Sequence, residues 1–445
     1  MHRLHRAAST ARDLLAQRAD GRWELFAKAS EVHTLVRSAA FPEQETRIEE
    51  TGIAVRISSG GRSGFAAASG LEAAASRQAI DGAFDQARPV PHDPIPPERL
   101  LGSIQPPQRP GLPPPGWASF IEERLDGRIR AESHGLLVPV RITVYEGRYA
   151  WILTNREGTV ATHHGTACSV AADLVRDDWG AVRQWTWVRD PAALDPEELA
   201  VRITDRGLLG GRPGSLRSGL WDVLLASEPA AQLLAALEPL FVAGPRGGAS
   251  AVGHLVDREG LLTSPCLTLV DDRPGEHGPL TAPCDGEGLP ARRITILDRG
   301  VPRHRIASYA DAVAAQEVPH GGARRVSYRE PPISGSANLM VVTGDGEPPA
   351  RLLQRAPSAL YLTRLLAPVT IDAGRNLIRM LASGLRLAGA RPSSWHPLLE
   401  LRGGLGPMLR SIEAIGTDLE WYETTAGYVG APSILIRSQP VFEGG

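Results

Sequence analysis

The stretch from Trp221 to Pro239 reads WDVLLASEPAAQLLAALEP. Its apolar run, beginning near Val223, predicts a strand that feeds a helix, and that helix continues as Ala235-Ala-Leu-Glu-Pro-Leu240. A helical zinc site of the His-Glu-x-x-x-His kind needs two histidines, five residues apart on one helix, that can both bind the same ion. The sequence has no histidine between Leu220 and Gly253, and none of its 12 histidines is followed by glutamate. This segment therefore cannot carry such a site.

The composition is that of an ordinary globular protein. The chain has 445 residues, of which 42% are hydrophobic, and this length suggests two or three domains. No apolar run approaches the roughly 18 residues needed to cross a bilayer, and the N-terminus has no apolar signal core, so we expect a cytoplasmic protein without membrane contact. The formal net charge of −2 predicts no direct binding of nucleic acid. Lys28 is the only lysine, and no Gly-rich phosphate loop precedes it.

The three cysteines are Cys168, Cys266 and Cys284. Their number is odd, their spacing is wide, and no Cys-x-x-Cys pair occurs. This pattern argues against both a disulfide framework and a cysteine-type zinc site. We expect buried, reduced thiols.

Residues 1–88 are predicted to form an N-terminal α/β domain. A helix over Ala7 to Ala19 precedes alternating apolar positions from Trp23 to Val36, which are typical of strands. Gly52 to Ala68 holds two β-rich runs around a Gly-Gly turn and predicts a hairpin. A second helix is expected over Leu71 to Ala87, because its apolar residues recur at helical spacing.

Proline and glycine mark two linkers. Eleven prolines lie between Pro89 and Pro115, and since proline removes backbone donors we assign residues 89–116 as a Pro-rich linker. The glycines of residues 207–219 indicate a second, flexible linker.

Residues 117–206, between the linkers, are predicted to form a middle β-meander domain. A helix around Phe120 to Ser133 opens it. A strand then reaches Val144, turns at Glu146-Gly147 and returns, and a further turn follows over Thr154 to Gly158.

Residues 220–445 are predicted to form the C-terminal domain, with short β-rich runs and a few helices, notably Pro407 to Ile415. The predicted fold class is therefore α+β. Mixed α/β N-terminal domains precede a larger, mostly antiparallel, β-rich C-terminal domain.

Four segments resemble the TldD/PmbA family: Trp221–Pro239, Leu267-Thr-Leu-Val-Asp-Asp272, Cys284-Asp-Gly-Glu-Gly-Leu-Pro290 and Leu405–Glu420. In the TldD branch, the helix after the Val223 strand carries the zinc ligands and a cysteine near the C-terminus completes the site. This chain lacks both, and so it resembles the PmbA branch, also called TldE, which pairs with TldD without carrying the zinc. A departure occurs at residues 371–388, which are more apolar than the family's usual Gly-rich segment.

The acidic residues Asp271, Asp272, Asp285 and Glu287 are the candidates for a substrate-cavity wall. Asp285-Gly-Glu-Gly288 is interpreted as a turn whose acids face water or an arginine. The sequence suggests no catalytic residue and no metal ligand, since the histidines are isolated or, at His163-His164, point to opposite strand faces.

The resemblance implies a non-catalytic subunit of a heterodimeric zinc metallopeptidase. The zinc and the His-Glu-x-x-x-His motif would belong to a TldD-like partner, and this chain would close the cavity in which peptides are processed, as in leader-peptide removal. The sequence does not decide whether this chain forms a homodimer when it is alone, or whether it has any activity by itself. Two alternatives remain: a regulatory protein of the gyrase-modulator type that acts without TldD, and a stand-alone hydrolase using Asp285 and Glu287.

Overall fold

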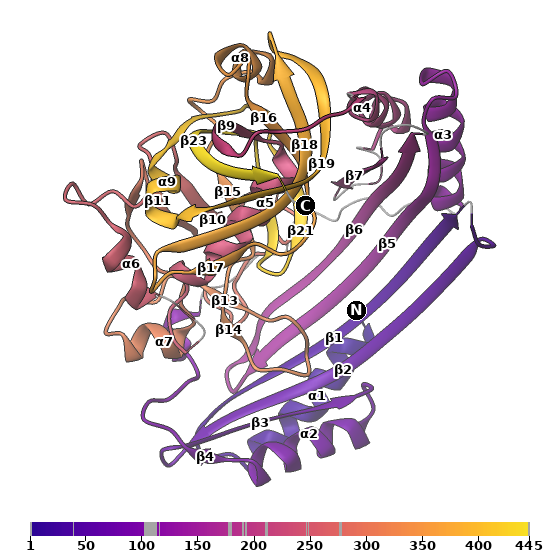
Figure 1. Cartoon of the computed structure of the whole chain (residues 1–445). Helices are drawn as coiled ribbons and strands as arrows, with labels where there is room; N and C mark the ends of the chain where they lie inside the picture. The colour runs from indigo at the N-terminus through magenta and orange to yellow at the C-terminus, as the bar shows by residue number, and fades with distance from the viewer. Residues whose placement is uncertain are drawn as a thin grey trace.

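The computed structural model describes residues 2–38, 40–101, 114, 116–176, 180–188, 191, 194–209, 212–245, 247, 249–275 and 278–443. Figure 1 shows a long, twisted sheet with helices at both of its ends, packed beside a rounded C-terminal domain. Both parts are rich in antiparallel strands, so the predicted α+β fold class is confirmed.

One seven-stranded sheet extends through the N-terminal half of the chain in the order β4-β3-β2-β1-β5-β6-β7. Its strands are β1 (Arg22–Ser38), β2 (Gln44–Ser59), β3 (Arg62–Ser69), β4 (Arg88–Pro89), β5 (Val138–Asn155), β6 (Gly158–Arg176) and β7 (Gly180–Val188). Strands β1 and β5 pair antiparallel over 15 residues, from Glu24 opposite Asn155 to Ser38 opposite Arg141. The predicted units 1–88 and 117–206 therefore share a single sheet, although each contributes its own hydrophobic cluster.

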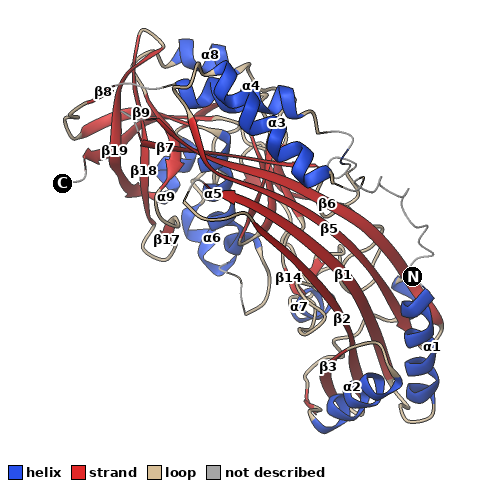
Figure 2. Cartoon of the chain, turned by 90° about the vertical axis from the view of Figure 1, so that its right-hand side faces the viewer, coloured by secondary structure: helices blue, strands red, loops and turns tan. Residues whose placement is uncertain are grey.

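Helices cover one face of this sheet, as Figure 2 shows. They are α1 (His2–Ala16), α2 (Ala73–Asp85), α3 (Trp117–Glu132) and α4 (Pro196–Leu208). Alternation explains the coverage, because successive strand residues point to opposite faces. Leu25 and Ile53 pack with α1 and α2, whereas Ile142 and Val170 pack with α3 and α4. Even-numbered residues of β1 and odd-numbered residues of β5 are left to face the C-terminal domain.

The predicted turn at Glu146-Gly147 is wrong. Strand β5 continues through it, since Glu146 pairs with His33 on one side and with Cys168 on the other. A turn there would leave backbone groups unpaired on both neighbouring strands, and this loss outweighs the weak turn preference of the dipeptide. The turn after Thr154 is confirmed: Asn155 Oδ1 accepts the Glu157 N–H at 3.0 Å between β5 and β6.

The described residues of the C-terminal domain form two larger sheets and one small one. An eight-stranded sheet comprises β8 (Arg212–Pro213), β9 (Gly219–Leu225), β16 (Leu360–Leu365), β17 (Thr370–Asp372), β18 (Leu377–Ala388), β19 (Arg391–Gly404), β20 (Ile412–Ile415) and β23 (Ile434–Glu443). A six-stranded sheet comprises β10 (Leu269–Asp272), β11 (Arg293–Asp298), β12 (Val301–Pro302), β15 (Asn338–Val341), β21 (Glu420–Thr424) and β22 (Gly427–Ala431). The small sheet pairs β13 (Ala323–Arg324) with β14 (Ile333–Ser334).

The stretch that begins at Trp221 forms strand β9 followed by α5 (Ser227–Leu237), as predicted. Helix α5 is buried along most of its length and shares one hydrophobic core with strands of both larger sheets. The chain then tightens into a 3₁₀ turn, η3 (Glu238–Phe241), because Pro239 cannot continue an α-helix with full hydrogen bonding. Four short helices follow in the described part of this domain: α6 (Ala249–Leu255), α7 (Tyr309–Ala314), α8 (Pro349–Arg355) and α9 (Leu405–Arg410).

The helix predicted over Pro407 to Ile415 is too long. Helix α9 ends at Arg410, and Ile412 to Ile415 form β20, which pairs with β23. The apolar side chains of this segment are buried in the core because the segment pairs with the sheet as a strand. Hydrophobic periodicity alone does not distinguish this short strand from a continued helix.

The two predicted linkers are described only in part. Residues 102–113, 115 and 210–211 lie outside the described residues. Of the rest, Glu98–Leu100 form a 3₁₀ turn, α4 extends to Leu208, and β8 pairs with β19. No helix in the described part of the chain is long and apolar enough to cross a membrane.

Candidate functional site

A buried network of two glutamates and two arginines joins the long sheet to the C-terminal domain. Arg56 Nη2 on β2 donates to Glu24 Oε2 on β1 at 2.9 Å, and both terminal nitrogens of Arg56 lie 3.2 Å from Glu287 Oε1. Arg325 Nη2 donates to Glu24 Oε1 at 2.6 Å. The second oxygen of Glu287 accepts the Tyr309 N–H at 2.7 Å. Each charge in this network therefore has a partner, as buried charges require.

The two glutamates of the network differ in their acidity. Burial alone would raise the pKa of Glu24, but the charges of Arg56 and Arg325 outweigh it and hold that pKa below its usual value. For Glu287, burial exceeds the opposing effect of Arg56 and raises the pKa to about 7. A pKa near neutrality would suit an acid–base catalyst. Both carboxylate oxygens of Glu287 are already hydrogen-bonded, however, so the geometry favours a structural role.

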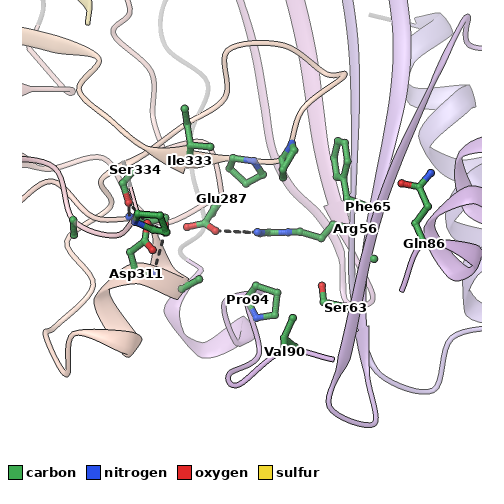
Figure 3. Close-up of a pocket in the computed structure, with 17 residues that line it drawn as sticks. Arg56, Ser63, Phe65, Gln86, Val90, Pro94, Glu287, Asp311, Ile333 and Ser334 are labelled. Carbon is green, nitrogen blue, oxygen red and sulfur yellow. Dashed lines mark hydrogen bonds and ion pairs between the residues drawn. The ribbon is translucent and has the colours of Figure 1, made fainter. Parts of the chain in front are cut away.

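One side of this network opens into a cavity of about 580 Å³, which we call the Arg56 cavity. Figure 3 shows Arg56 and Glu287 crossing it, with Asp311 and Ser334 at one end and Phe65 and Gln86 at the other. Asp311 Oδ2 accepts hydrogen bonds from the hydroxyls of Ser308 and Ser334. No histidine lines this cavity among the described residues, so neither serine has a base of the kind a nucleophile needs.

A second cavity, of about 550 Å³, lies between the long sheet and the C-terminal domain. We call it the sheet cavity. Strands β1 and β5 supply one wall, and the segments around β13 and β22 supply the other. Its lining includes five aromatic and five basic residues, among them Phe26, Lys28, Tyr149, Trp151, Arg324 and Tyr428.

Three aromatic side chains of the sheet cavity belong to one ring cluster, which is completed by His163 behind the lining. The rings of Phe26 and Trp151 are 5.8 Å apart, and those of Trp151 and His163 are 5.4 Å apart. The ring of Tyr149 lies 5.5 Å from the His163 ring. Such a surface holds apolar groups and leaves polar tips accessible to a ligand.

Two of the four predicted acidic residues lie away from both cavities. Asp271 is fully buried; its carboxylate accepts the N–H groups of Ala337 and Asn338 at 3.0 and 2.8 Å and that of Arg273 Nε at 2.8 Å. Asp272 is partly buried and lines neither cavity. The contacts of Asp271 make it a structural tie between β10 and β15.

Asp285 lines the sheet cavity, whereas Glu287 lines the Arg56 cavity. Asp285 Oδ1 accepts the N–H groups of Glu287 and Leu289, both at 2.9 Å, and its Oδ2 accepts that of Ala323 at 3.0 Å. Burial, partly offset by the charge of Arg273, raises the pKa of Asp285 above its usual value. The predicted turn is present, with its acids turned inward: Glu287 meets an arginine, as expected, and Asp285 holds the backbone.

The residues around η3 do not fit a zinc ion. Glu238 Oε1 there accepts the N–H and hydroxyl of Ser336 at 2.9 and 3.2 Å. Among the described residues, no three His, Cys, Asp or Glu side chains gather as a metal-binding group. Burial raises the pKa of Cys284, in the sheet cavity, well above its ordinary value, so this thiol is no ready nucleophile.

Sequence reasoning missed Glu24, Arg56 and Arg325. A signal existed for two of them, because Glu24 and Arg56 interrupt the strongly apolar runs of β1 and β2. A charge within a buried strand needs a partner, although the sequence does not say which.

A family model described as the PmbA/TldA metallopeptidase C-terminal domain matches residues 218–441. The chain belongs to the PmbA/TldD family. The resemblance seen in the sequence is thereby confirmed, and the C-terminal domain is of the PmbA/TldD type. No curated protein matches the sequence.

Solved structures match this PmbA/TldD chain over nearly its whole length. TldE from Thermococcus kodakarensis has a TM-score of 0.85 at 14% identity, covering 98% of this chain and 99% of that one. A proposed modulator of DNA gyrase from Thermotoga maritima MSB8 has a TM-score of 0.77 at 15% identity, with coverage of 98% and 99%. Another, from Bacteroides thetaiotaomicron VPI-5482, has a TM-score of 0.79 at 14% identity, with coverage of 99% and 98%. At these identities the likeness shows the fold.

Proposed function

We propose that this chain is the TldE-type subunit of a heterodimeric zinc metallopeptidase. In this proposal it closes the peptide cavity and stabilises a TldD-like partner, which supplies the zinc and its His-Glu-x-x-x-His motif. Removal of leader peptides during the maturation of peptide natural products is the processing reaction that we favour, in the cytoplasm.

One observation carries the proposal: the family's zinc-helix position is built here as a buried packing element. Helix α5 contributes Ala231, Leu234 and Ala235 to the core, and Glu238 after it is bound to Ser336. A cavity large enough for a peptide segment nevertheless lies between the two parts of the chain. Among the described residues no metal-binding group gathers there and the Cys284 thiol is no ready nucleophile, which suits a subunit that shares a substrate with a catalytic partner.

Co-expression with a TldD-like chain encoded by a neighbouring gene tests the proposal. We expect a 1:1 complex in size-exclusion chromatography, one zinc per heterodimer, and peptide hydrolysis that requires both chains. The isolated chain is expected to bind no stoichiometric zinc and to hydrolyse no peptide.

Three results would contradict it. Near-stoichiometric zinc and peptidase activity in the isolated chain would show that it is itself the catalyst. Activity that survives chelators and disappears in Glu287→Gln would instead support a hydrolase that uses the buried carboxyls. Failure to bind any TldD-like chain would favour the regulatory alternative.

A further inference from the structure

Lys28 is the only lysine of the chain, and it lines the sheet cavity. It lies on β1 directly opposite Trp151 of β5 and Gly52 of β2. The buried ring of Tyr328 packs directly against Gly52, because a Cβ placed on this glycine would be 2.0 Å from that ring. Lys28 therefore lies, in the register of the sheet, between Trp151 and the position where Tyr328 covers Gly52.

Lys28 is partly buried and forms no hydrogen bond or ion pair with any described residue. Ser30, two residues further along the same face, also lines the cavity and has no hydrogen-bond partner in the described part of the chain. An ammonium group offers three donors and no acceptor, and a hydroxyl adds a fourth donor. Together these groups present donors without a matching acceptor from the protein.

The neighbouring acids do not neutralise Lys28. Glu50 pairs with Ser30 across β1 and β2, but its carboxylate is 2.7 Å from Arg329. Asp285 uses its oxygens on backbone N–H groups, and Glu24 is held by two arginines. The charge of Lys28 is therefore available to a ligand.

The far end of the cavity has the opposite character. Glu423 lines it beside Tyr145 and Tyr428, and burial, with the charge of Glu423, raises the pKa of both phenols. Tyr145 lies opposite Thr34, six residues from Lys28 along β1, which corresponds to about 20 Å of extended strand. A carboxylate is therefore favoured at the Lys28 end and disfavoured at the Glu423 end.

We propose that the sheet cavity binds a peptide through a carboxylate, which Lys28 and Ser30 hold, with an adjacent aromatic or apolar residue against Trp151. This inference rests on the proposed function only in taking the ligand to be a peptide. The carboxylate comes either from an acidic side chain or from the C-terminus of the peptide, since both present the same acceptor oxygens.

Calorimetric titration of the full chain tests this site. The probes are acetyl-Ala-Phe-Glu-Phe-Ala-amide, its Gln counterpart, and acetyl-Ala-Ala-Phe with a free or an amidated C-terminus. We expect at least one carboxylate peptide to bind about tenfold to a hundredfold more tightly than its neutral counterpart, as charge-assisted hydrogen bonds imply. The pair that shows this preference identifies the source of the carboxylate.

Variants assign the preference to Lys28. Lys28→Met should abolish it, and Lys28→Arg should retain most of it, because the positive charge remains. Arg375→Met is the matched control, since it removes one positive charge from a side chain that is 81% exposed on the distant turn before β18. Circular dichroism checks that each variant is folded.

The inference is overturned if neither carboxylate peptide binds, if each binds no better than its neutral counterpart, or if folded Lys28→Met keeps the preference. These outcomes are separate from those of the co-expression experiment. A carboxylate preference in a chain that binds no TldD-like partner would uphold the site and reject the proposed function. Formation of the complex by a chain that shows no carboxylate preference would uphold the proposed function and reject the site.

Discussion

Replacing Arg56 by methionine should strongly destabilise the protein. The guanidinium is buried and contacts Glu24 at 2.9 Å and Glu287 at 3.2 Å. Removing one partner of a buried ion pair costs roughly 3 to 5 kcal/mol. Glu24 keeps Arg325, so only Glu287 is left without a cation, and we expect a loss of about 3 kcal/mol, near the lower end of that range.

The stability lost in Arg56→Met should depend on pH. Glu287 has a pKa of about 7 even beside Arg56, and removal of that cation raises it further, so protonation relieves the buried charge as the pH falls. Above pH 7 the double variant Arg56→Met/Glu287→Gln should recover at least about 1 kcal/mol relative to Arg56→Met alone, because the unpaired charge is gone.

Thermal and urea unfolding followed by circular dichroism measure both effects. Arg379→Met serves as the control, because it removes an arginine that is 57% exposed and paired with Glu400 at 2.6 Å. Such a surface pair contributes about 0 to 1 kcal/mol. The reasoning is refuted if Arg56→Met is no more destabilising than Arg379→Met above pH 7, or if adding Glu287→Gln lowers stability further.

Two further variants probe the same junction. The folded pKa of Glu287, about 7, exceeds the ordinary 4.5, so the stability it contributes is complete below about pH 4.5 and is lost as the pH rises through 7. Glu287→Gln should therefore gain stability relative to the wild type across this window, and a constant difference in unfolding free energy would contradict the assignment. Gly52→Ala should cost about 1 to 3 kcal/mol, because its Cβ would lie 2.0 Å from Tyr328. Gly219→Ala, with open space around the added methyl, should have little effect in the same unfolding measurement.

Local signals predicted local structure well. The Gly60-Gly61 turn, helix α2 and the Asn155 turn each depend on a few adjacent residues, and each is present in the structure. The failures at Glu146-Gly147 and after Arg410 have a common cause, since both segments are strands held by partners distant in sequence. Strand pairing can override weak turn or helix preferences.

The candidate site was predictable only as a set of residue types. Asp285 and Glu287 line cavities, but their roles depend on groups that the sequence places far away, such as Arg56, which is 231 positions from Glu287. Lys28 stands out in the sequence as the only lysine, yet its place beside Trp151 follows from the pairing of β1 with β5. No spacing rule links residues 28 and 151.

That same pairing imposes a delay during synthesis. Strand β1 ends at Ser38 and can join β2 as soon as the hairpin emerges, whereas its other edge pairs with β5, which begins only at Val138. At about 5 to 20 residues per second, a ribosome needs on the order of ten seconds to make the intervening chain. For that time a 17-residue strand presents an open edge, the kind of surface that recruits strands from other chains. Neighbouring ribosomes on one messenger would expose matching edges together, so the yield of folded protein should depend on how quickly residues 38 to 155 are translated.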